Sequence, residues 1–156
     1  MSTRPRGFTL VEALVALLVL SVGMLGAWEL QLSSLRSHND AIRQAAAQEL
    51  LRDMAERIRA NAPAGSRYAS ADVSPPATGC TAATPCSSAE LAALDVAWFA
   101  ERAAALFPGQ DTATLVEFVP ATGPTDADDI VVSLQWRGAR ERQSASLHVP
   151  VPPVAG

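Results

Sequence analysis

The feature that most constrains this sequence is an apolar run near its amino terminus, from Phe8 to Trp28. It reads FTLVEALVALLVLSVGMLGAW, and Glu12 is its single charged residue. A helix needs about 20 apolar residues to cross the hydrocarbon core of a bilayer, and this run is long enough. Because lipid offers no partners to exposed backbone groups, a segment in the membrane must be helical. We therefore expect a membrane helix over residues 8–28.

Glu12 is the unusual residue of this run. A carboxylate at the centre of a membrane helix costs roughly 2.5–3.5 kcal/mol on insertion scales, and less near an end, so an acid in such a helix is a functional candidate by default. A buried carboxylate of this kind requires a cation. The alternative is a charge that is tolerated because it lies near the membrane surface, where water reaches it.

The residues before the run, MSTRPRG, form a short basic leader that ends in Gly7. Arg4 and Arg6 precede the run, and the next basic residue is Arg36. By the positive-inside rule the leader stays in the cytoplasm and the chain after Trp28 is exported. A cleaved secretory signal is the rival interpretation, with a small-residue site near Ala27. That interpretation leaves Glu12 without a role.

The segment from Arg4 to Glu12, RPRGFTLVE, resembles the class III signal of type IV pilins and pseudopilins. In that family a prepilin peptidase cuts after the glycine and N-methylates the exposed phenylalanine, and the acid four positions further on is needed for assembly. The resemblance therefore implies cleavage between Gly7 and Phe8, methylation of Phe8, and an assembly role for Glu12.

Elementary electrostatics agrees with this resemblance. Cleavage after Gly7 leaves a positively charged amine on Phe8, and N-methylation keeps that charge. In a bundle of parallel helices, the Glu12 carboxylate of one subunit can meet the amine of a neighbour. An ion pair in a low-dielectric medium is strongly favoured over two lone charges. The pair would set the axial register between subunits.

The helix is predicted to continue beyond the apolar run, because no Pro or Gly occurs from Glu29 to Asn61. Asp53 and Arg57 have helical pair spacing, and Asn61-Ala62-Pro63 ends the pattern. We expect a leader (1–7), a membrane or filament-core helix (8–28), an amphipathic continuation (29–61) and an exported head (62–156). The apolar stripe of the continuation is predicted at three- or four-residue spacing: Leu35, Ile42, Ala46, Leu50 or Leu51, Met54 and Ile58.

The head is predicted to begin with a loop from Ala62 to Ser88, followed by a short helix. Ser87 and Glu90 have the spacing of a capping box, and Pro108-Gly109 ends the helix. The buried face of this helix is expected at Leu91, Leu94, Trp98 and Ala105 or Leu106. Three β-rich runs follow, Thr114–Val119, Ile130–Trp136 and Ser144–Val149. The fold class is therefore α+β: a long helix on a small head with a short helix and an antiparallel sheet.

The resemblance extends to the head. The helix segment Ala45–Asn61, the cysteine loop, the following AELAALDVAWFAERAAALFPG and the strand ending at Arg137 are similar to PilV-type minor pilins. This implies an inner-membrane protein with a periplasmic head that joins other minor pilins, the major pilin and the assembly platform, and primes fibre growth at the tip. Major pilins usually carry a proline after the apolar start, and this chain has none between Phe8 and Asn61.

Two other functions fit parts of the sequence. A type II secretion pseudopilin would have the same signal and long helix. A protein of another class, a single-span inner-membrane protein whose periplasmic head binds a ligand or regulates a partner, would keep its leader uncleaved. No nucleophile elbow, P-loop or HExxH motif occurs, so we expect a processing substrate rather than an enzyme, with no catalytic residues and no cofactor.

Cys80 and Cys86 are the two cysteines, with Pro85 between them. In an oxidising compartment they favour a disulfide, which for so short a loop contributes roughly 2 kcal/mol. Free thiols remain the alternative. A metal site would need more ligands, and His38 and His148 are far away in sequence, so no metal is expected.

The remaining charged and aromatic clusters have plain structural interpretations. Asp126, Asp128 and Asp129 could collect calcium, but the sequence lacks the full loop pattern and a solvated turn is favoured. The net charge of −4 argues against nucleic-acid binding. An arginine cluster is expected to be a solvated hairpin rather than a DNA or partner contact; it consists of Arg137, Arg140 and Arg142. Three aromatic residues are expected in the core: Trp98, Phe99 and Trp136.

Overall fold

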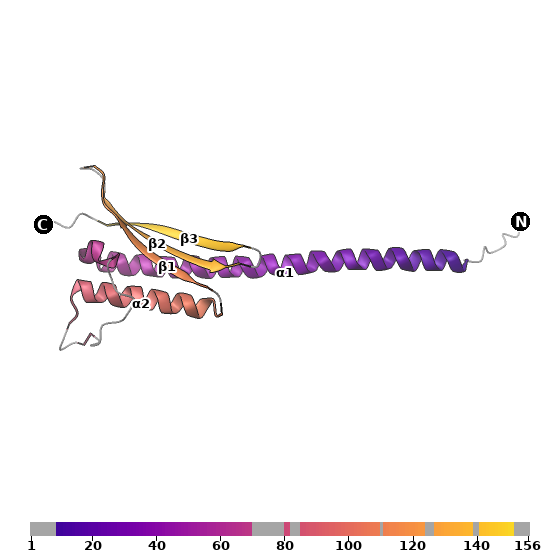
Figure 1. Ribbon diagram of the computed structural model, residues 1–156, viewed down its shortest axis with the longest axis horizontal. Helices are drawn as coiled ribbons and strands as arrows, with labels where there is room; N and C mark the ends of the chain where they lie inside the picture. Colours follow the sequence, from indigo (N-terminus) through magenta and orange to yellow (C-terminus); the bar gives the residue numbers. More distant parts are fainter. Residues whose placement is uncertain are drawn as a thin grey trace, which may run out of the picture. The chain divides into compact units, whose positions relative to one another are not determined.

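The computed structural model describes residues 9–69, 80–81, 85–109, 111–123, 127–138 and 141–151. Its elements form a long helix, a short 3-10 helix, a second helix and a three-stranded antiparallel sheet, which confirms the predicted α+β class (Figure 1). In chain order they are α1 (Leu10–Ala60), η1 (Ala62–Tyr68), α2 (Ser88–Leu106), β1 (Ala113–Val119), β2 (Asp128–Arg137) and β3 (Arg142–Val151).

The chain divides into two compact units, Met1–Asn39 and Asp40–Gly156. Helix α1 supplies the described part of the first unit from Leu10 onward. The second unit, which we call the head unit, contains the carboxyl-terminal part of α1 and all the other elements. The first unit extends eleven residues beyond Trp28, the end of the predicted membrane segment.

The buried stripe of α1 begins later than predicted. Leu35 is 61% exposed and Ile42 is 55% exposed, so neither belongs to the core of the head unit. The helical spacing of these residues is correct, but burial requires a facing element, which the sequence pattern does not reveal. The α1 side chains that are buried share one face of its last four turns: Ala47, Leu50, Leu51, Met54, Ala55 and Ile58.

Helix η1 was not expected, because a loop was predicted from Ala62. Pro63 fixes a φ compatible with a tight turn, and Gly65 takes φ 50° and ψ −125°, a left-handed conformation that favours glycine. This turn brings Tyr68 back against α1, where its side chain is 1% exposed. The segment after α1 therefore contributes to the core rather than only connecting two helices.

Helix α2 has the predicted start but a different buried face. Ser87 is its N-cap, and Glu90 completes the capping box, which confirms that prediction. Leu91 and Leu106 are 39% and 42% exposed, so the predicted burial of these two residues is wrong. The side chains that point into the core instead repeat at helical spacing and include two alanines, which allow close packing: Ala92, Val96, Phe99 and Ala103.

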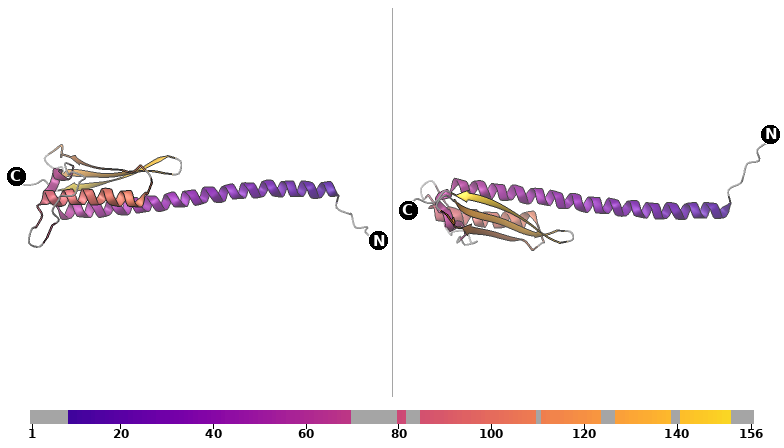
Figure 2. Two further views of the ribbon diagram at one scale, coloured as in Figure 1. Left: turned by 60° about the horizontal axis from the view of Figure 1, so that its bottom comes forward. Right: turned by 90° about the horizontal axis from the view of Figure 1, so that it is seen from above.

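The sheet has the order β1-β2-β3, and both neighbouring pairs are antiparallel. All three predicted strands are present. One face of the sheet lies against the helices of the head unit (Figure 2). Trp136 of β2 is 1% exposed and stacks on Phe107 with ring centroids 5.1 Å apart. The buried sheet residues alternate along β2 and end β3: Ile130, Val132, Leu134, Trp136, Val149 and Val151.

Candidate functional site

The first unit presents a continuous apolar helix surface. Between Leu10 and Leu25 the large apolar side chains are more than half exposed, from 56% at Val15 to 78% at Leu10. The most apolar window of α1 has a mean hydropathy of 2.3 and none of it is buried. A contiguous apolar surface of this size is not stable in water and requires lipid or other apolar helices around it.

Glu12 lies in the first turn of α1 and is exposed. Its backbone N–H donates to the hydroxyl of Thr9 at 3.3 Å and to the carbonyl of Thr9 at 3.0 Å. Thr9 therefore acts as the N-cap of α1, and Glu12 occupies the third helical position. Thr9 and Glu12 have the spacing of a capping box, a sequence signal that was available and was not used.

Two physical effects act on Glu12. A carboxylate in the first turn of a helix interacts favourably with the helix dipole, by about 0.3–1 kcal/mol. The carboxylate also lacks an ion-pair partner among the residues that the structure describes. The helix dipole therefore stabilises the Glu12 carboxylate only modestly. The carboxylate can still pair with a cation outside the described residues. The predicted cleavage site, Gly7 and Phe8, lies outside the described residues.

A polar network joins α1, η1 and α2 inside the head unit. The guanidinium of Arg57 contacts Asp95 at 3.0 Å, and the Tyr68 hydroxyl donates to the other oxygen of Asp95 at 2.9 Å. Asn61, which is 9% exposed, donates from its amide to the Tyr68 hydroxyl at 3.3 Å and to the Ser88 carbonyl at 2.9 Å. The network therefore fixes the two helix ends around the buried tyrosine.

The environment of Tyr68 keeps it protonated. Burial raises the pKa of its hydroxyl well above the ordinary value of 10.0, and the hydrogen bond and negative charge of Asp95 raise the pKa further. The hydrogen bond from Asn61 and the charge of Arg57 act in the opposite direction and are outweighed. A neutral phenol that must donate to a carboxylate is a structural tie rather than a catalytic acid or base.

Arg57 makes further contacts that explain its position. Its guanidinium carbon lies 3.9 Å from the centroid of the Trp98 ring, and its Nε lies 3.6 Å from the carboxylate of Asp53. The helical pair predicted between Asp53 and Arg57 is thus confirmed. Trp98 is only partly buried, in contrast to Phe99 and Trp136, and one of its faces supports this cation.

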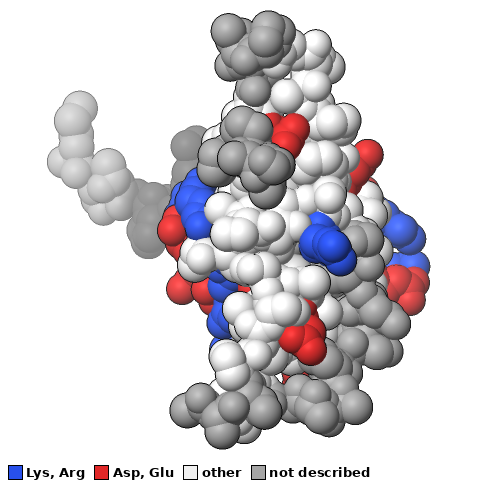
Figure 3. Space-filling view, turned by 90° about the vertical axis from the view of Figure 1, so that its left-hand side faces the viewer, with Lys and Arg blue, Asp and Glu red and all other residues white. Residues whose placement is uncertain are grey.

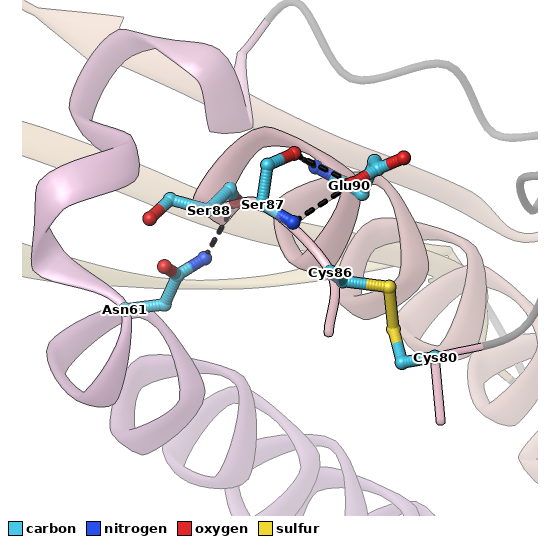
Figure 4. Close-up of a disulfide and its surroundings, with 6 residues drawn as sticks. All are labelled: Asn61, Cys80, Cys86, Ser87, Ser88 and Glu90. Atoms are coloured by element: carbon cyan, nitrogen blue, oxygen red, sulfur yellow. Dashed lines mark hydrogen bonds between the residues drawn. A yellow bond between two sulfur atoms is a disulfide. The ribbon is translucent and has the colours of Figure 1, made fainter. Parts of the chain in front are cut away.

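The structure joins Cys80 and Cys86 in a disulfide with a Cα–Cα distance of 5.2 Å (Figure 4). The Ser87 N–H, next in the chain, donates to the Glu90 carboxylate at 2.8 Å. Hydrogen bonds from the backbone and hydroxyl of Ser87 lower the pKa of Glu90 below its ordinary value. The disulfide loop therefore leads directly into the rigid start of α2.

The predicted acidic and basic clusters are held by local contacts. Asp128 accepts a hydrogen bond from the Ala121 N–H at 2.9 Å, and Asp129 contacts the His148 ring at 2.5 Å. Asp126, the third member of the predicted turn, lies outside the described residues. No group of three His, Cys, Asp or Glu side chains that could hold a metal ion occurs in the described part of the chain.

Basic side chains are similarly dispersed. Arg137 lies 3.6 Å from Asp111, and it pairs across the sheet with Arg142. Arg140 lies outside the described residues. On the face of the molecule that Figure 3 shows, basic and acidic side chains alternate over a largely uncharged surface. Nucleic-acid binding relies on basic patches, and this face does not provide one.

A groove of about 500 Å³ lies between α1 and α2 in the head unit. The partly exposed Trp98 and Leu106 form one wall, and Leu50 lies in α1 opposite them. Charged side chains complete the lining of the groove: Glu49, Asp53 and Arg102. The apolar residues of α2 that were predicted to be buried thus include three that line a surface groove, Trp98, Ala105 and Leu106.

Comparisons with known families cover residues 2–97 of the chain. Residues 2–28 match the model of the prokaryotic N-terminal methylation motif, and residues 29–97 match the Tt1218-like model, described as type IV pilin Tt1218. Comparisons with curated proteins and with solved structures gave no match. The two matches adjoin each other and the fold agrees with them, and together they support a type IV pilin.

Proposed function

We propose that this pilin is a minor subunit of a type IV pilus, of the PilV class. In this proposal it is processed by prepilin peptidase and joins other minor pilins in the complex that primes fibre growth at the tip. The observation that carries the proposal is Glu12. It is the single charged residue of the apolar run Phe8–Trp28, and it lies four positions after Phe8 of the Gly7-Phe8 signal.

Each part of the chain has a role in this mechanism. The leader, residues 1–7, is removed between Gly7 and Phe8, and the new amine on Phe8 is methylated. Residues 8–28 then hold the subunit in the inner membrane with residues 62–156 in the periplasm. When subunits leave the bilayer, apolar helices replace lipid around one another, and the amphipathic residues 29–61 link that bundle to the heads.

Glu12 would set the register of the bundle. Its carboxylate carries a full charge in apolar surroundings, where the amine of a neighbouring subunit's first residue is the available cation. Because two unpaired charges are far less favourable than a pair in such a medium, subunits would dock where amine and carboxylate meet. The capping contact with Thr9 holds the first turn in place for this pairing.

One observation supports a minor role rather than a major one. Helix α1 runs from Leu10 to Ala60 without a proline, whereas major pilins usually carry one after the apolar start. The head has a sheet of three strands and a groove between α1 and α2 that offers a neighbour a lateral contact. Interaction with the major pilin and the assembly platform would follow from the shared signal and helix.

The test separates the two effects at Glu12. Glu12→Gln keeps a side chain that can complete a capping box but removes the charge, whereas Glu12→Ala removes both. We expect both variants to be cleaved normally and both to lose incorporation into pili and co-purification with other pilin subunits, by tenfold or more. A charge interaction with a neighbour requires this result, since the first turn of Glu12→Gln remains capped.

Normal incorporation of Glu12→Gln with loss in Glu12→Ala would assign Glu12 a capping role and contradict the register mechanism. Gly7→Ala serves as the processing control. It should leave the leader attached and slow the migration of the chain on a gel, because the peptidase of this family cuts after a glycine.

A type II secretion pseudopilin is the second candidate, because the methylation motif and the long apolar helix suit it equally. Deletion of the gene distinguishes the two: loss of surface pili with normal protein secretion supports the minor pilin, and the reverse supports the pseudopilin. A single-span membrane protein with a periplasmic binding head would keep its leader and need neither system.

A further inference from the structure

Strand β3 is an edge of the sheet. It pairs with β2 along its whole length, from Arg142 to Val151, and no strand pairs with its other side in the part of the chain that the structure describes. A free edge presents a row of unpaired backbone N–H and C=O groups, which is a template for another strand. The position of one proline in β3 shows which residues direct these backbone groups outward.

Pro150 lies opposite Asp129 in the β2–β3 pairing. Opposed residues of antiparallel strands alternate between pairs that exchange both hydrogen bonds and pairs that exchange none. Since proline has no N–H to donate, Pro150 belongs to the second kind. Every second residue before it does too, so His148, Ser146 and Ser144 direct their N–H and C=O groups away from β2. Their backbone groups have no hydrogen-bond partner among the described residues.

A groove of about 400 Å³ runs beside this edge. The strand contributes Ala145, Ser146 and Leu147, and α1 contributes the buried Leu51. The other α1 residues of the groove recur every four positions, so they form one row along the helix: Gln44, Gln48 and Arg52. The free edge therefore has a floor on α1 against which the side chains of an added strand can rest.

We propose that an extended segment of another pilin subunit adds to β3 as a fourth strand and lies in this groove. The backbone groups of Ser144, Ser146 and His148 would bind it, in the manner of strand addition. Its inward side chains would meet Leu51 and the two glutamine amides. Arg52 is exposed and has no ion pair with a described residue, so a carboxylate of the added strand fits beside it. The identity of this partner rests on the proposed function.

A second copy of the chain is a poorer occupant than a different subunit. Two β3 strands that pair symmetrically are related by a twofold axis and run antiparallel. In the head unit β3 and the end of α1 run alongside each other in both views of Figure 2, so the two α1 helices would point in opposite directions. The helix bundle of the proposed function instead requires parallel subunits.

The experiment compares Ser146→Pro with Ser146→Ala in the full chain, expressed with the other pilin subunits of its own assembly system. Both substitutions remove the hydroxyl, but only proline removes the backbone N–H. That N–H points away from β2, so the β2–β3 ladder is preserved in both variants. We expect Ser146→Pro to be recovered with partner pilins about fivefold less than Ser146→Ala, the effect of one lost hydrogen bond of about 1 kcal/mol.

Arg52→Glu tests the charge, with Arg59→Glu as the matched control, because Arg59 lies on α1 but outside the groove and pairs with Glu56. Only the first should reduce recovery with partners. Hydrogen exchange on the wild-type chain gives an independent readout. The amides of Ser144, Ser146 and His148 should exchange at least about tenfold more slowly in the assembled state than in the isolated subunit.

Equal recovery of Ser146→Pro and Ser146→Ala, with unchanged exchange at these amides on assembly, would overturn the proposal. Loss of incorporation in Glu12→Gln alongside that result would leave the proposed function standing, so the two failures are distinguishable. A wild-type chain that never associates with pilins would overturn both. Crosslinking of Ser146→Cys to another copy of the chain would make that copy the occupant and contradict a heterologous strand.

Discussion

At the scale of single residues, the polar groups around Tyr68 in the head unit are paired with one another, whereas the carboxylate in the apolar run has no such partner in the described part of the chain. Tyr68 and Asp95 satisfy each other inside the head, whereas Glu12 has no ion pair among the described residues. A satisfied buried network favours one arrangement of the elements that carry it. An unpaired carboxylate in apolar surroundings favours association with a cation.

The Tyr68 network yields a stability prediction. Tyr68→Phe removes the hydroxyl that donates to Asp95 and receives from Asn61, and it leaves those groups without that partner. We expect the head to lose about 1–3 kcal/mol of its free energy of unfolding, measured by urea denaturation of the purified full chain in detergent. Asp53→Asn is the control. It removes an exposed partner of the same Arg57 and should cost less than about 1 kcal/mol. Equal effects of the two substitutions would contradict the assignment.

The same residue predicts an alkaline limit to stability. In the unfolded chain Tyr68 ionises near its ordinary pKa of 10.0, and burial raises the pKa in the folded head. A raised folded pKa gives stability that is complete below the unfolded pKa and is lost as pH rises above it. We therefore expect the melting temperature to fall above pH 10.0 in the wild type and to fall less steeply in Tyr68→Phe. Parallel pH profiles would show that Tyr68 is not the group responsible.

Residue roles were predictable from sequence where the partner is close in the chain. The three-residue spacing of Ser87 and Glu90 is enough to predict their capping box. The signal around Glu12 is a contiguous sequence motif. Tyr68 and Asp95 are 27 residues apart, and no local pattern connects them. Asn61 was interpreted only as a helix end, although its amide also ties η1 to α2.

At the scale of elements, helix and strand positions were predicted more reliably than buried faces. Periodicity located α1, α2 and the three strands because each has its own hydrophobic period. It misplaced the inner face of α2 because large side chains were given more weight than small ones. Ala92 and Ala103 are fully buried, since close contact between elements requires small residues at the contact. Helix η1 was missed because its turn depends on Gly65 and on the docking of Tyr68.

The corrected face of α2 makes a matched test possible. Ala103 is fully buried and Ala105, two residues later, is exposed on the same helix. Ala103→Leu should overpack the core and lower the free energy of unfolding by about 1–3 kcal/mol. Ala105→Leu should change it by less than about 0.5 kcal/mol, because it adds a side chain at the surface. Urea denaturation of the two variants measures both, and a larger effect at Ala105 would restore the original assignment of the buried face.

At the scale of the whole molecule, α1 contributes to two units whose surfaces differ. The unit that contains Leu10–Asn39 exposes apolar side chains and the head unit buries its own. The sequence predicted a change of segment after Trp28, where the composition changes, and the two units divide after Asn39. It did not predict the free edge of β3 or the grooves of the head. Those features depend on how distant elements pack, and they are where we expect neighbouring subunits to bind.

Mass spectrometry of the amino terminus, on chain purified from cells with its native peptidase, tests the central claim most directly. That claim is that a trimmed, charged first residue is the cation for Glu12 of a neighbour. The account predicts a polypeptide that begins at Phe8 and carries a methyl group on its amino nitrogen. A chain that still begins at Met1, or that begins beyond Ala27, would contradict it.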